Sequence, residues 1–440
     1  MSAKKNYIII TLFVLLSSGL SSQVQIDSFD GLWSMTVKQN PTLKTYKLNI
    51  QIAIDNRRAS LSYLMPTVLL NATAQDNFKI ATTVINGSLL GQPNETLTMQ
   101  LGAKYNYSAG LSANYTLFDW QKITEGRQAK NAIRLQEAQE AYYLQTLKNM
   151  AASLYFQSLV SLKAQEINRK DLELADTLID IAAKKYNEGA VSLIDLNQSK
   201  INYNQIAQNL IASENLYESN LQQIRILLGL KPDEGIIIQG QLPDNIEEKE
   251  YRLGEDKLLE TYLRMVKDAQ YNLRIQQQAY APTLSLNAYY GANQFQKTLD
   301  AFSFKSSYWH RQEYIGLSLT TTLFSGLENL NKIKAARKSF ELAQMQSDIA
   351  ELQSAINDRL LLEEIVRKGI SAEKAAEAFF LYRDNLKMYH IQYQEGAIDL
   401  NTFLTYFQYY LIAENAYFSQ LSSYYNDLSI IISRNQTETR

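Results

Sequence analysis

The residues best suited to catalysis or metal binding are few and widely spaced. The 440-residue chain has no cysteine and two histidines, His310 and His390. This excludes disulfides, thiolate metal sites, a cysteine nucleophile and an imidazole cluster for zinc. Carboxylate pairs such as Glu363-Glu364 and Glu247-Glu248 lack a spacing typical of general acid–base work, and no Gly-rich phosphate loop, GxSxG elbow or HExxH occurs. We therefore expect no enzyme activity, cofactor or metal.

Charge and composition narrow the fold class. With 43 Lys and Arg against 45 Asp and Glu, the net charge of -2 gives no positive field to attract nucleic acid. Only 6 Pro and 17 Gly leave few turns for a many-stranded fold, while 29 Tyr and 15 Phe are ample. The composition indicates long helices with a few aromatic-rich strands.

The N-terminal residues have the pattern of a secretory signal. Lys4 and Lys5 precede an apolar run, Ile8 to Leu16, and small residues from Ser17 to Ser22 offer a cleavage site after Ser21. The run of about nine residues is far shorter than the roughly 20 that span a bilayer. We predict a signal peptide over 1–22. No later stretch is long and apolar enough to be predicted as a transmembrane helix. If the mature protein crosses a membrane, it must therefore do so with strands.

The sequence contains an internal duplication. Pro66 and Pro282 begin strand-like runs, Phe118 and Phe324 end others, and Glu188-Gly189-Ala190 and Glu395-Gly396-Ala397 follow long helical segments, each pair about 210 residues apart. We predict a first structural repeat over 23–230, an equatorial linker over 231–254 and a second repeat over 255–440.

The segments between each Phe and each Gly of this duplication predict very long helices. Each has about 70 residues with no Pro, and apolar residues recur there at steps of three and four, the pattern of a coiled-coil seam. The returning segments, Val191 to Leu228 and Ile398 to Ile432, complete two helical hairpins. The predicted seams are Leu172, Ala175, Ile179, Ala182, Tyr186; Leu342, Met345, Ile349, Leu352, Ile356; and Phe403, Tyr406, Tyr410, Ala413, Tyr417, Leu421, Tyr424.

Two further helical segments precede the strand-like runs. They cover Phe29 to Ser62, with a break or restart at Asn40-Pro41, and Glu255 to Ala281. Stacked on the returning segments, each would nearly match the length of a long helix. We expect composite helical columns beside two continuous ones.

The strand-like runs are Pro66–Phe78, Ser108–Phe118, Pro282–Phe295 and Tyr314–Phe324. Each has about the length that a tilted strand needs to cross a bilayer, and the last two alternate apolar with polar residues. A half-buried strand in a soluble sandwich explains the alternation equally well. Because four strands cannot close a barrel and open edges are not tolerated in lipid, a transmembrane sheet would need several chains, and three chains supply 12 strands.

The order and spacing of these motifs resemble the TolC-like outer-membrane efflux proteins. The match covers Asn40-Pro41, Leu117-Phe118-Asp119, Pro66, Pro282 and both Glu-Gly-Ala turns. The resemblance implies a mostly α fold with a membrane β-barrel portion: in a homotrimer, four strands per chain contribute to a 12-stranded β-barrel, and the hairpins form a periplasmic α-barrel. It also implies a passive exit duct in the outer membrane of a Gram-negative bacterium, with a long periplasmic extension. An inner-membrane efflux pump or ABC exporter and a periplasmic adaptor would use it for efflux or type I secretion.

The resemblance assigns the two hairpin turns to adaptor docking. The residues concerned are Gly189, Ala190, Val191, Ser192, Gly396, Ala397 and Ile398. Independently of that assignment, each glycine fits a helix C-cap in the left-handed conformation.

A periplasmic gate would use residues close to the same turns. Asp195 matches an aspartate of the family, but Thr402 and Thr405 occupy the positions that would carry its acidic ring, and Asp399 could substitute. Carboxylates from three chains at one level would attract cations and raise each other's pKa. An N-capping role explains both aspartates equally well. Tyr186 and Tyr393 complete the candidate gate, with seam packing as the alternative.

Two other classes of protein remain open from the sequence. A periplasmic coiled-coil adaptor or structural protein with a small sheet would also have a signal peptide and heptads, but it would not need strands of membrane-crossing length at matched places. A carbohydrate-active enzyme is a third reading, suggested by the tyrosines.

Overall fold

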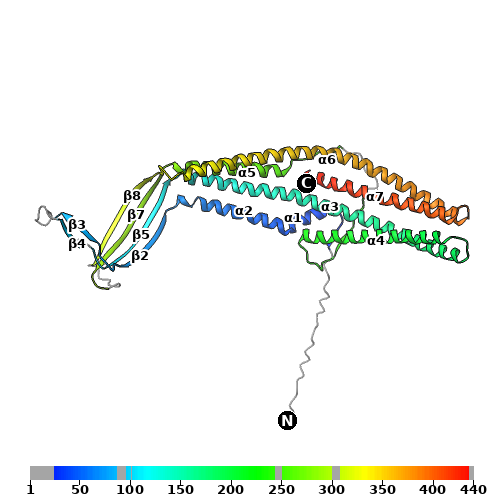
Figure 1. Cartoon of the computed structure of the whole chain (residues 1–440), viewed down its shortest axis with the longest axis horizontal. Coiled ribbons are helices and arrows are strands. Elements are labelled where there is room, and N and C mark those ends of the chain that lie inside the picture. Colours follow the sequence, from blue (N-terminus) through cyan, green and yellow to red (C-terminus); the bar gives the residue numbers. More distant parts are fainter. Residues whose placement is uncertain (1–23, 87–95, 101, 243–249, 300–307, 436–440) are drawn as a thin grey trace, which may run out of the picture. The chain divides into compact units, whose positions relative to one another are not determined.

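The structure, a computed structural model, describes residues 24–86, 96–100, 102–242, 250–299 and 308–435 (Figure 1). It is mostly helical, as predicted. The α-helices of these ranges are α1 (Phe29–Gln39), α2 (Pro41–Ser60), α3 (Trp120–Asn187), α4 (Leu193–Leu228), α5 (Lys257–Gln277), α6 (Glu328–Gln394) and α7 (Leu400–Arg434). Within the described residues, no helix combines the length and apolar character required to span a membrane. The predicted signal peptide lies outside the described residues.

The chain divides into two compact units. Unit 1 comprises Met1–Lys47, Gln139–Leu258 and Glu351–Arg440, and unit 2 comprises Leu48–Ala138 and Leu259–Ala350. Each unit draws on both halves of the sequence, and α3 and α6 contribute residues to both units.

Unit 2 contains a four-stranded antiparallel sheet in the order β2-β5-β7-β8 (Figure 1). The strands are β2 (Thr67–Asp76), β5 (Tyr105–Phe118), β7 (Thr283–Gln296) and β8 (Trp309–Thr320). Each matches a predicted strand. However, β8 ends at Thr320 rather than at Phe324, because Thr321 donates its hydroxyl hydrogen bond to the Tyr280 carbonyl and the chain then turns through Gly326 and Leu327, both with positive φ.

Among the described residues, no further strand pairs with either edge of this sheet. β2 and β8 are its two edge strands, and every residue of β2 is exposed, including Val68, Leu69 and Leu70. A second antiparallel pair, β3 (Thr82–Asn86) with β4 (Thr96–Gln100), was not predicted. Its short alternating segments lie between β2 and β5 in the sequence, where the prediction placed only a connection.

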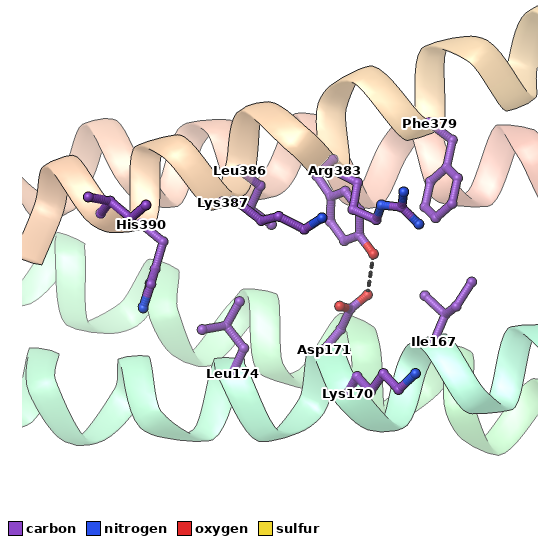
Figure 2. Close-up of a pocket in the computed structure, with 11 residues that line it drawn as sticks. Ile167, Lys170, Asp171, Leu174, Phe379, Arg383, Leu386, Lys387 and His390 are labelled. Atoms are coloured by element: carbon purple, nitrogen blue, oxygen red, sulfur yellow. Dashed lines mark hydrogen bonds between the residues drawn. The ribbon is translucent and has the colours of Figure 1, made fainter.

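Unit 1 is built around the hairpins α3–α4 and α6–α7. Its core follows heptad positions, since buried residues of α7 recur at alternating steps of four and three. These residues are Phe403, Phe407, Tyr410, Glu414, Tyr417, Leu421 and Tyr424. The predicted seam named Tyr406, which is half-buried, where the structure buries Phe407; it also named Ala413, which is buried, but missed Glu414 beside it. In α3 the corresponding positions include Asp171, whose carboxylate meets the Tyr410 hydroxyl of α7 at 2.8 Å (Figure 2).

The seam predicted at the start of α6 is left exposed by the described residues. Leu342, Met345 and Ile349 are exposed, whereas Ala336 and Ala350 on another side of the same helix are buried. An α-helix in water does not ordinarily carry such an apolar stripe toward solvent. The stripe is therefore apolar surface that the described part of one chain leaves uncovered.

Asn40 ends α1 and starts α2, as predicted for the Asn40-Pro41 pair. Its side-chain amide donates to the Leu227 carbonyl at 2.8 Å, and its side-chain oxygen accepts from the Leu43 N–H at 2.8 Å and from the Tyr143 hydroxyl at 3.2 Å. Because Asn40 is buried, these bonds satisfy polar groups that the helix break would otherwise leave unpaired.

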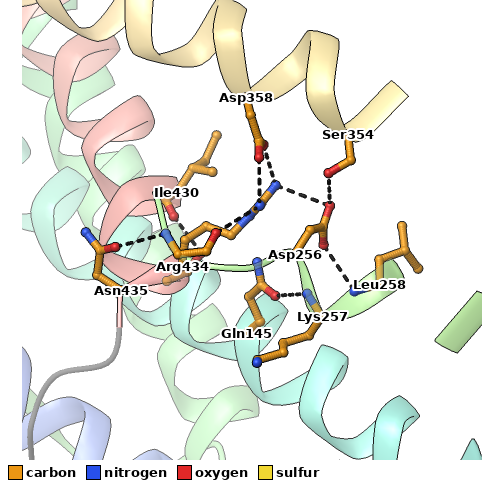
Figure 3. Close-up of polar contacts among 11 residues, drawn as sticks. Gln145, Asp256, Lys257, Leu258, Ser354, Asp358, Ile430, Arg434 and Asn435 are labelled. Atoms are coloured by element: carbon orange, nitrogen blue, oxygen red, sulfur yellow. Dashed lines mark hydrogen bonds and ion pairs between the residues drawn. The ribbon is translucent and has the colours of Figure 1, made fainter. Parts of the chain in front are cut away.

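Short segments connect the remaining parts of unit 1. β1 (Val24–Ile26) pairs in parallel with β6 (Ile236–Ile238), and β6 lies in the predicted linker. Arg434, at the end of α7, binds Asp358 of α6 at 2.7 Å and Asp256 at 3.2 Å (Figure 3). Asp256 also accepts a hydrogen bond from Ser354, so a single guanidinium joins α7, α6 and the segment before α5.

Candidate functional site: the turns between paired helices

The turn from α3 to α4 closes around Gly189. Its φ of 73° lies in the left-handed region, and the Ala190 N–H donates to the Lys185 carbonyl at 2.8 Å while the Gly189 N–H donates to the Tyr186 carbonyl at 3.0 Å. This pattern is a Schellman motif, which satisfies the last carbonyls of α3. No other atom would approach a Cβ built on Gly189, so the backbone conformation and not crowding selects glycine.

The turn from α6 to α7 repeats this geometry. Gly396 also has a φ of 73°, its N–H donates to the Tyr393 carbonyl at 3.1 Å, and the Ala397 N–H donates to the Gln392 carbonyl at 2.8 Å. The two turns lie at the same end of unit 1 (Figure 1). The duplication detected in the sequence is therefore reproduced down to individual hydrogen bonds.

Both candidate gate aspartates cap helices. Asp195 and Ser192 form a reciprocal capping box at the start of α4, with the Ser192 N–H donating to Asp195 at 2.9 Å. Asp399 accepts from the Thr402 N–H at 2.8 Å at the start of α7. The hydrogen bonds from Thr402 hold the pKa of Asp399 below its usual value, so this exposed carboxylate stays charged at neutral pH.

The two candidate gate tyrosines have different surroundings. Tyr393 is buried, stacks on Phe403 with ring centroids 5.6 Å apart and lies under the Lys185 ammonium group at 4.6 Å. Tyr186, at the matching position of the other hairpin, is largely exposed. The first position packs the two hairpins together, and the second presents a phenol to the surroundings.

The surfaces beside the turns also differ. Leu193 and Ile194 are exposed at the start of α4, with 77% of Ile194 accessible, whereas Leu400 at the start of α7 is buried. The α3–α4 turn thus carries apolar side chains that could contact another protein, next to Val191 and Ser192.

Asp171 of α3 and Glu414 of α7 form a buried carboxyl pair that was not predicted from the sequence. Glu414 is only 1% exposed, its Oε2 atom has no hydrogen-bond partner among the described residues, and its carboxyl group bonds to Asp171. Burial is the main cause that raises the pKa of Asp171 to about 6 and that of Glu414 to about 9, the latter with a contribution from the Asp171 charge. The pair therefore holds one proton at neutral pH. Burial also raises the pKa of Tyr410, which stays a hydrogen-bond donor.

The heptad pattern could have revealed this pair. Counting steps of four and three from Phe403 places Glu414 at a seam position, and counting back from Ala175 places Asp171 at one. The predicted seams contain their apolar neighbours Ala413 and Leu172 instead. A charged residue at a seam position indicates a buried polar group, and a search for apolar periodicity alone does not find it.

The described residues contain no group of three or more His, Asp or Glu side chains placed to hold a metal ion. The turns and the carboxyl pair offer hydrogen bonds, charge and apolar surface. Among the described residues, these groups show no nucleophile paired with a base.

Comparisons with known proteins agree with this geometry. Residues 32–230 match the family model described as Outer membrane efflux protein. The Outer membrane protein TolC of Escherichia coli (strain K12) is 23% identical over 348 residues, which are 76% of this chain and 66% of that protein. The chain thus spans just under two thirds of the length of this curated relative.

Solved outer-membrane channels share the fold. The Campylobacter jejuni CmeC channel matches with a TM-score of 0.74 and 18% identity over 92% of this chain and 85% of its own. VceC from Vibrio cholerae matches with a TM-score of 0.71 and 17% identity over 92% and 95%. The chain is therefore similar to the TolC-like outer-membrane efflux proteins, and the family model covers its residues 32–230. The relatives and solved structures named here are described as outer-membrane proteins or outer-membrane channels.

Proposed function

We propose that three copies of this chain form a passive exit duct through the outer membrane for efflux or type I secretion. The observation that carries the proposal is the sheet β2-β5-β7-β8, whose two edges are unpaired and whose first strand is exposed on both faces. Exposed edges are incompatible with lipid unless another strand pairs with them. Pairing the β8 edge of one copy with the β2 edge of the next, three times, gives a closed 12-stranded barrel.

Apolar surface in the same unit supports this closure. The stripe Leu342, Met345 and Ile349 of α6 follows the β8 edge in sequence, while exposed Leu48 and Ile52 of α2 precede the β2 edge. A head-to-tail ring that joins β8 to β2 would bring these two apolar surfaces together. The helical parts would then line a periplasmic α-barrel that continues the duct.

The partners of the duct are an inner-membrane pump, either an efflux pump or an ABC exporter, and a periplasmic adaptor. Docking of the adaptor at the two turns is supported by their matched geometry and by the exposed Ile194. The docking residues are Gly189, Ala190, Val191, Ser192, Gly396, Ala397 and Ile398.

The gate of the duct lies at the same turns. Asp195, Asp399, Tyr186 and Tyr393 are its residues, and the low pKa of Asp399 supports a ring of charged carboxylates in a trimer. Tyr393 acts there through packing, since its side chain is buried.

The chain organisation follows the duplication: a signal peptide at 1–22, repeats at 23–230 and 255–440, and an equatorial linker at 231–254. The matched helix lengths support the two repeats, with 68 and 67 residues in α3 and α6 and 36 and 35 in α4 and α7.

The mass of the membrane-extracted protein tests the proposal. The full chain is expressed in a Gram-negative host, the outer membrane is separated from the inner membrane, and the detergent extract is measured by light scattering with the detergent mass subtracted. We expect outer-membrane protein with three times the mass of one chain. Release by osmotic shock or carbonate as a monomer or dimer would support a periplasmic coiled-coil protein instead.

Single-channel conductance of the purified trimer tests the gate. Asp399→Asn removes the charge but keeps a helix-capping oxygen, and we expect it to reduce the preference of the channel for cations. Unchanged selectivity for this variant and for Asp195→Asn would remove both aspartates from the gate.

A further inference from the structure

A cleft of about 640 Å³ lies in unit 1, lined by residues of α3 and α6 and by Tyr410 of α7 (Figure 2). Its volume is in the range of small-molecule sites, and its walls combine apolar side chains with a few polar groups, as such sites do. The cleft is lined by the stretch Ile167–Leu174 of α3 and by the stretch Phe379–Ile391 of α6, which ends just before the α6–α7 turn. The duct proposal does not require it.

We propose that this cleft binds an amphipathic organic anion, with an apolar aromatic or alkyl body and a carboxylate or sulfonate group. The inference rests on the residues of the cleft, independently of the proposed duct.

Three cationic side chains supply the recognition of the anionic group. Arg383 and Lys387 extend from α6 into the space between the helices, and Lys170 lines the cleft from α3 (Figure 2). Their ion pairs in the chain are exposed ones: Lys170 with Glu166 at 2.7 Å, and Lys387 and Arg383 with Asp384 at 3.1 and 3.7 Å. Because exposed ion pairs are weak, an incoming anion can compete with these carboxylates.

The only carboxylate that lines the cleft is already engaged. Asp171 accepts the hydrogen bond of Tyr410 at 2.8 Å and is bonded to Glu414 behind it. One proton held by the Asp171–Glu414 pair limits its charge to a single negative unit. The lining of the cleft thus has more positive than negative groups, which favours an anion over a cation.

The apolar wall accommodates the body of the ligand. Ile167 and Leu174 come from α3, and Phe379, Leu386 and Ile391 come from α6. Arg383 lies 6.0 Å from the centre of the Phe379 ring, so a planar ligand group could stack beside both. A small inorganic anion would leave this wall exposed, which is why the proposed ligand is amphipathic.

Such a ligand would join the two hairpins. Its anionic group would contact cations from α3 and α6, and its body would contact apolar residues of both helices. Occupancy should therefore slow the opening of these helices relative to each other.

The test uses the full-length protein in nanodiscs of zwitterionic lipid, titrated with naphthoate by calorimetry. Naphthylmethylamine, with the same rings and the opposite charge, is the matched probe, and empty nanodiscs give the lipid background. We expect saturable naphthoate binding at one site per chain and at least tenfold weaker binding of the amine. Equal binding of both probes, or binding no greater than that of empty nanodiscs, would overturn the proposal.

Variants assign the binding to this cleft. Arg383→Gln and Lys387→Gln should each weaken naphthoate binding at least fivefold, whereas Lys374→Gln should leave it unchanged. Lys374 is on the same helix and pairs with Glu377 outside the cleft. Unfolding curves by circular dichroism establish that each variant is folded.

Hydrogen exchange supplies a second readout that does not depend on the variants. Naphthoate should increase the protection of amides in Ile167–Leu174 and Phe379–Ile391. Protection that appears elsewhere in the chain and not in these two stretches would contradict the assignment.

Discussion

Glu414 is a carboxyl group at a position where a coiled-coil seam ordinarily holds an apolar side chain. Its neighbours along the seam are Tyr410 and Tyr417, both buried. A buried carboxyl pair is tolerated because one proton removes one of its two charges and Tyr410 donates to the other. The proton on the Asp171–Glu414 pair therefore stabilises the seam together with the apolar contacts.

The raised pKa values of Asp171 and Glu414 give this pair a contribution to stability that is larger in acid than in base. A carboxyl group whose pKa is higher in the folded than in the unfolded chain contributes stability that is complete below its unfolded pKa and lost as the pH rises through its folded pKa. For Glu414 this window runs from 4.5 to about 9, and for Asp171 from 3.8 to about 6. We expect Glu414→Gln to flatten the decline in thermal stability across this range and to raise stability at its alkaline end.

Thermal unfolding of the full protein at a series of pH values checks this prediction. Glu373→Gln, a change of an exposed glutamate on α6, serves as the control and should keep the pH profile of the unaltered chain. Infrared spectra offer a direct test, since the carbonyl stretch of a protonated carboxyl should be present at neutral pH and absent in Glu414→Gln. Identical pH profiles for both variants would show that the pair is not protonated as described.

At the scale of elements, the two turns depend on glycine for conformation alone. Gly189→Val places a β-branched residue at a φ of 73°, which we expect to cost about 1–2 kcal/mol in the turn. Gly189→Asn should cost less, because asparagine tolerates the left-handed region. Amide exchange at the ends of α3 and α4 measures the difference, and equal exchange in both variants would contradict a conformational role.

The same substitutions examine docking at the turns. Adaptor cross-linking and export should weaken with Gly189→Val and recover with Gly189→Asn, while insertion in the outer membrane stays intact. Normal export by the Val variants at both turns would remove them from the docking surface.

Arg434 is the main polar tie between α7, α6 and the segment before α5. Its side chain is 9% exposed, and Arg434→Met would leave Asp256 and Asp358 without their cation. We expect a loss of about 3 kcal/mol in unfolding free energy, by the usual cost of an unpaired buried charge. Arg252→Gln, which removes a fully exposed pair with Glu250, should change stability by less than about 0.5 kcal/mol. Chemical unfolding monitored by circular dichroism distinguishes the two.

Much of the element pattern could be predicted because it depends on local signals. Proline and glycine at matched places bounded the hairpins, and Asn40-Pro41 located a helix break that the structure shows as a hydrogen-bonded restart. The seams were less certain, because each helix packs on more than one neighbour and its apolar stripe is wider than one seam. Because the stripe is wide, Ala413 fitted the predicted seam, and Glu414 with its carboxyl pair was not predicted.

Other features depended on contacts between distant segments. The Arg434 cluster joins residues that are 76 and 178 positions apart, and no periodicity marks it. The β3–β4 pair is short, and its alternation over five residues per strand was too brief to separate from a connection. Such contacts are decided by tertiary packing, which one sequence does not display.

At the scale of the whole molecule, assembly should depend on the α6 stripe. Ile349 is 51% exposed in the single chain, so Ile349→Lys should leave the fold of a chain almost unaffected. In the proposed trimer the lysine would be buried without a counter-charge, and we expect the trimer to give way to smaller species at micromolar concentration. Light scattering measures the mass distribution.

Gln344→Lys adds the same charge on the opposite side of the helix and serves as the matched control. We expect it to remain trimeric. If both variants stayed trimeric at the same concentrations, the stripe would not be part of the assembly interface.

The pairing of β1 with β6 has a consequence for the order in which the chain can fold. Gln25 and Gln239, which bond across this pair, are 214 positions apart. During synthesis the β1 segment emerges early and has no partner until the whole of the first repeat has followed it. Loop closure over such a distance is slow compared with the formation of α3 and α4, whose contacts are local. We infer that the α3–α4 hairpin folds first. The β1 strand then pairs with β6 among the last steps of folding.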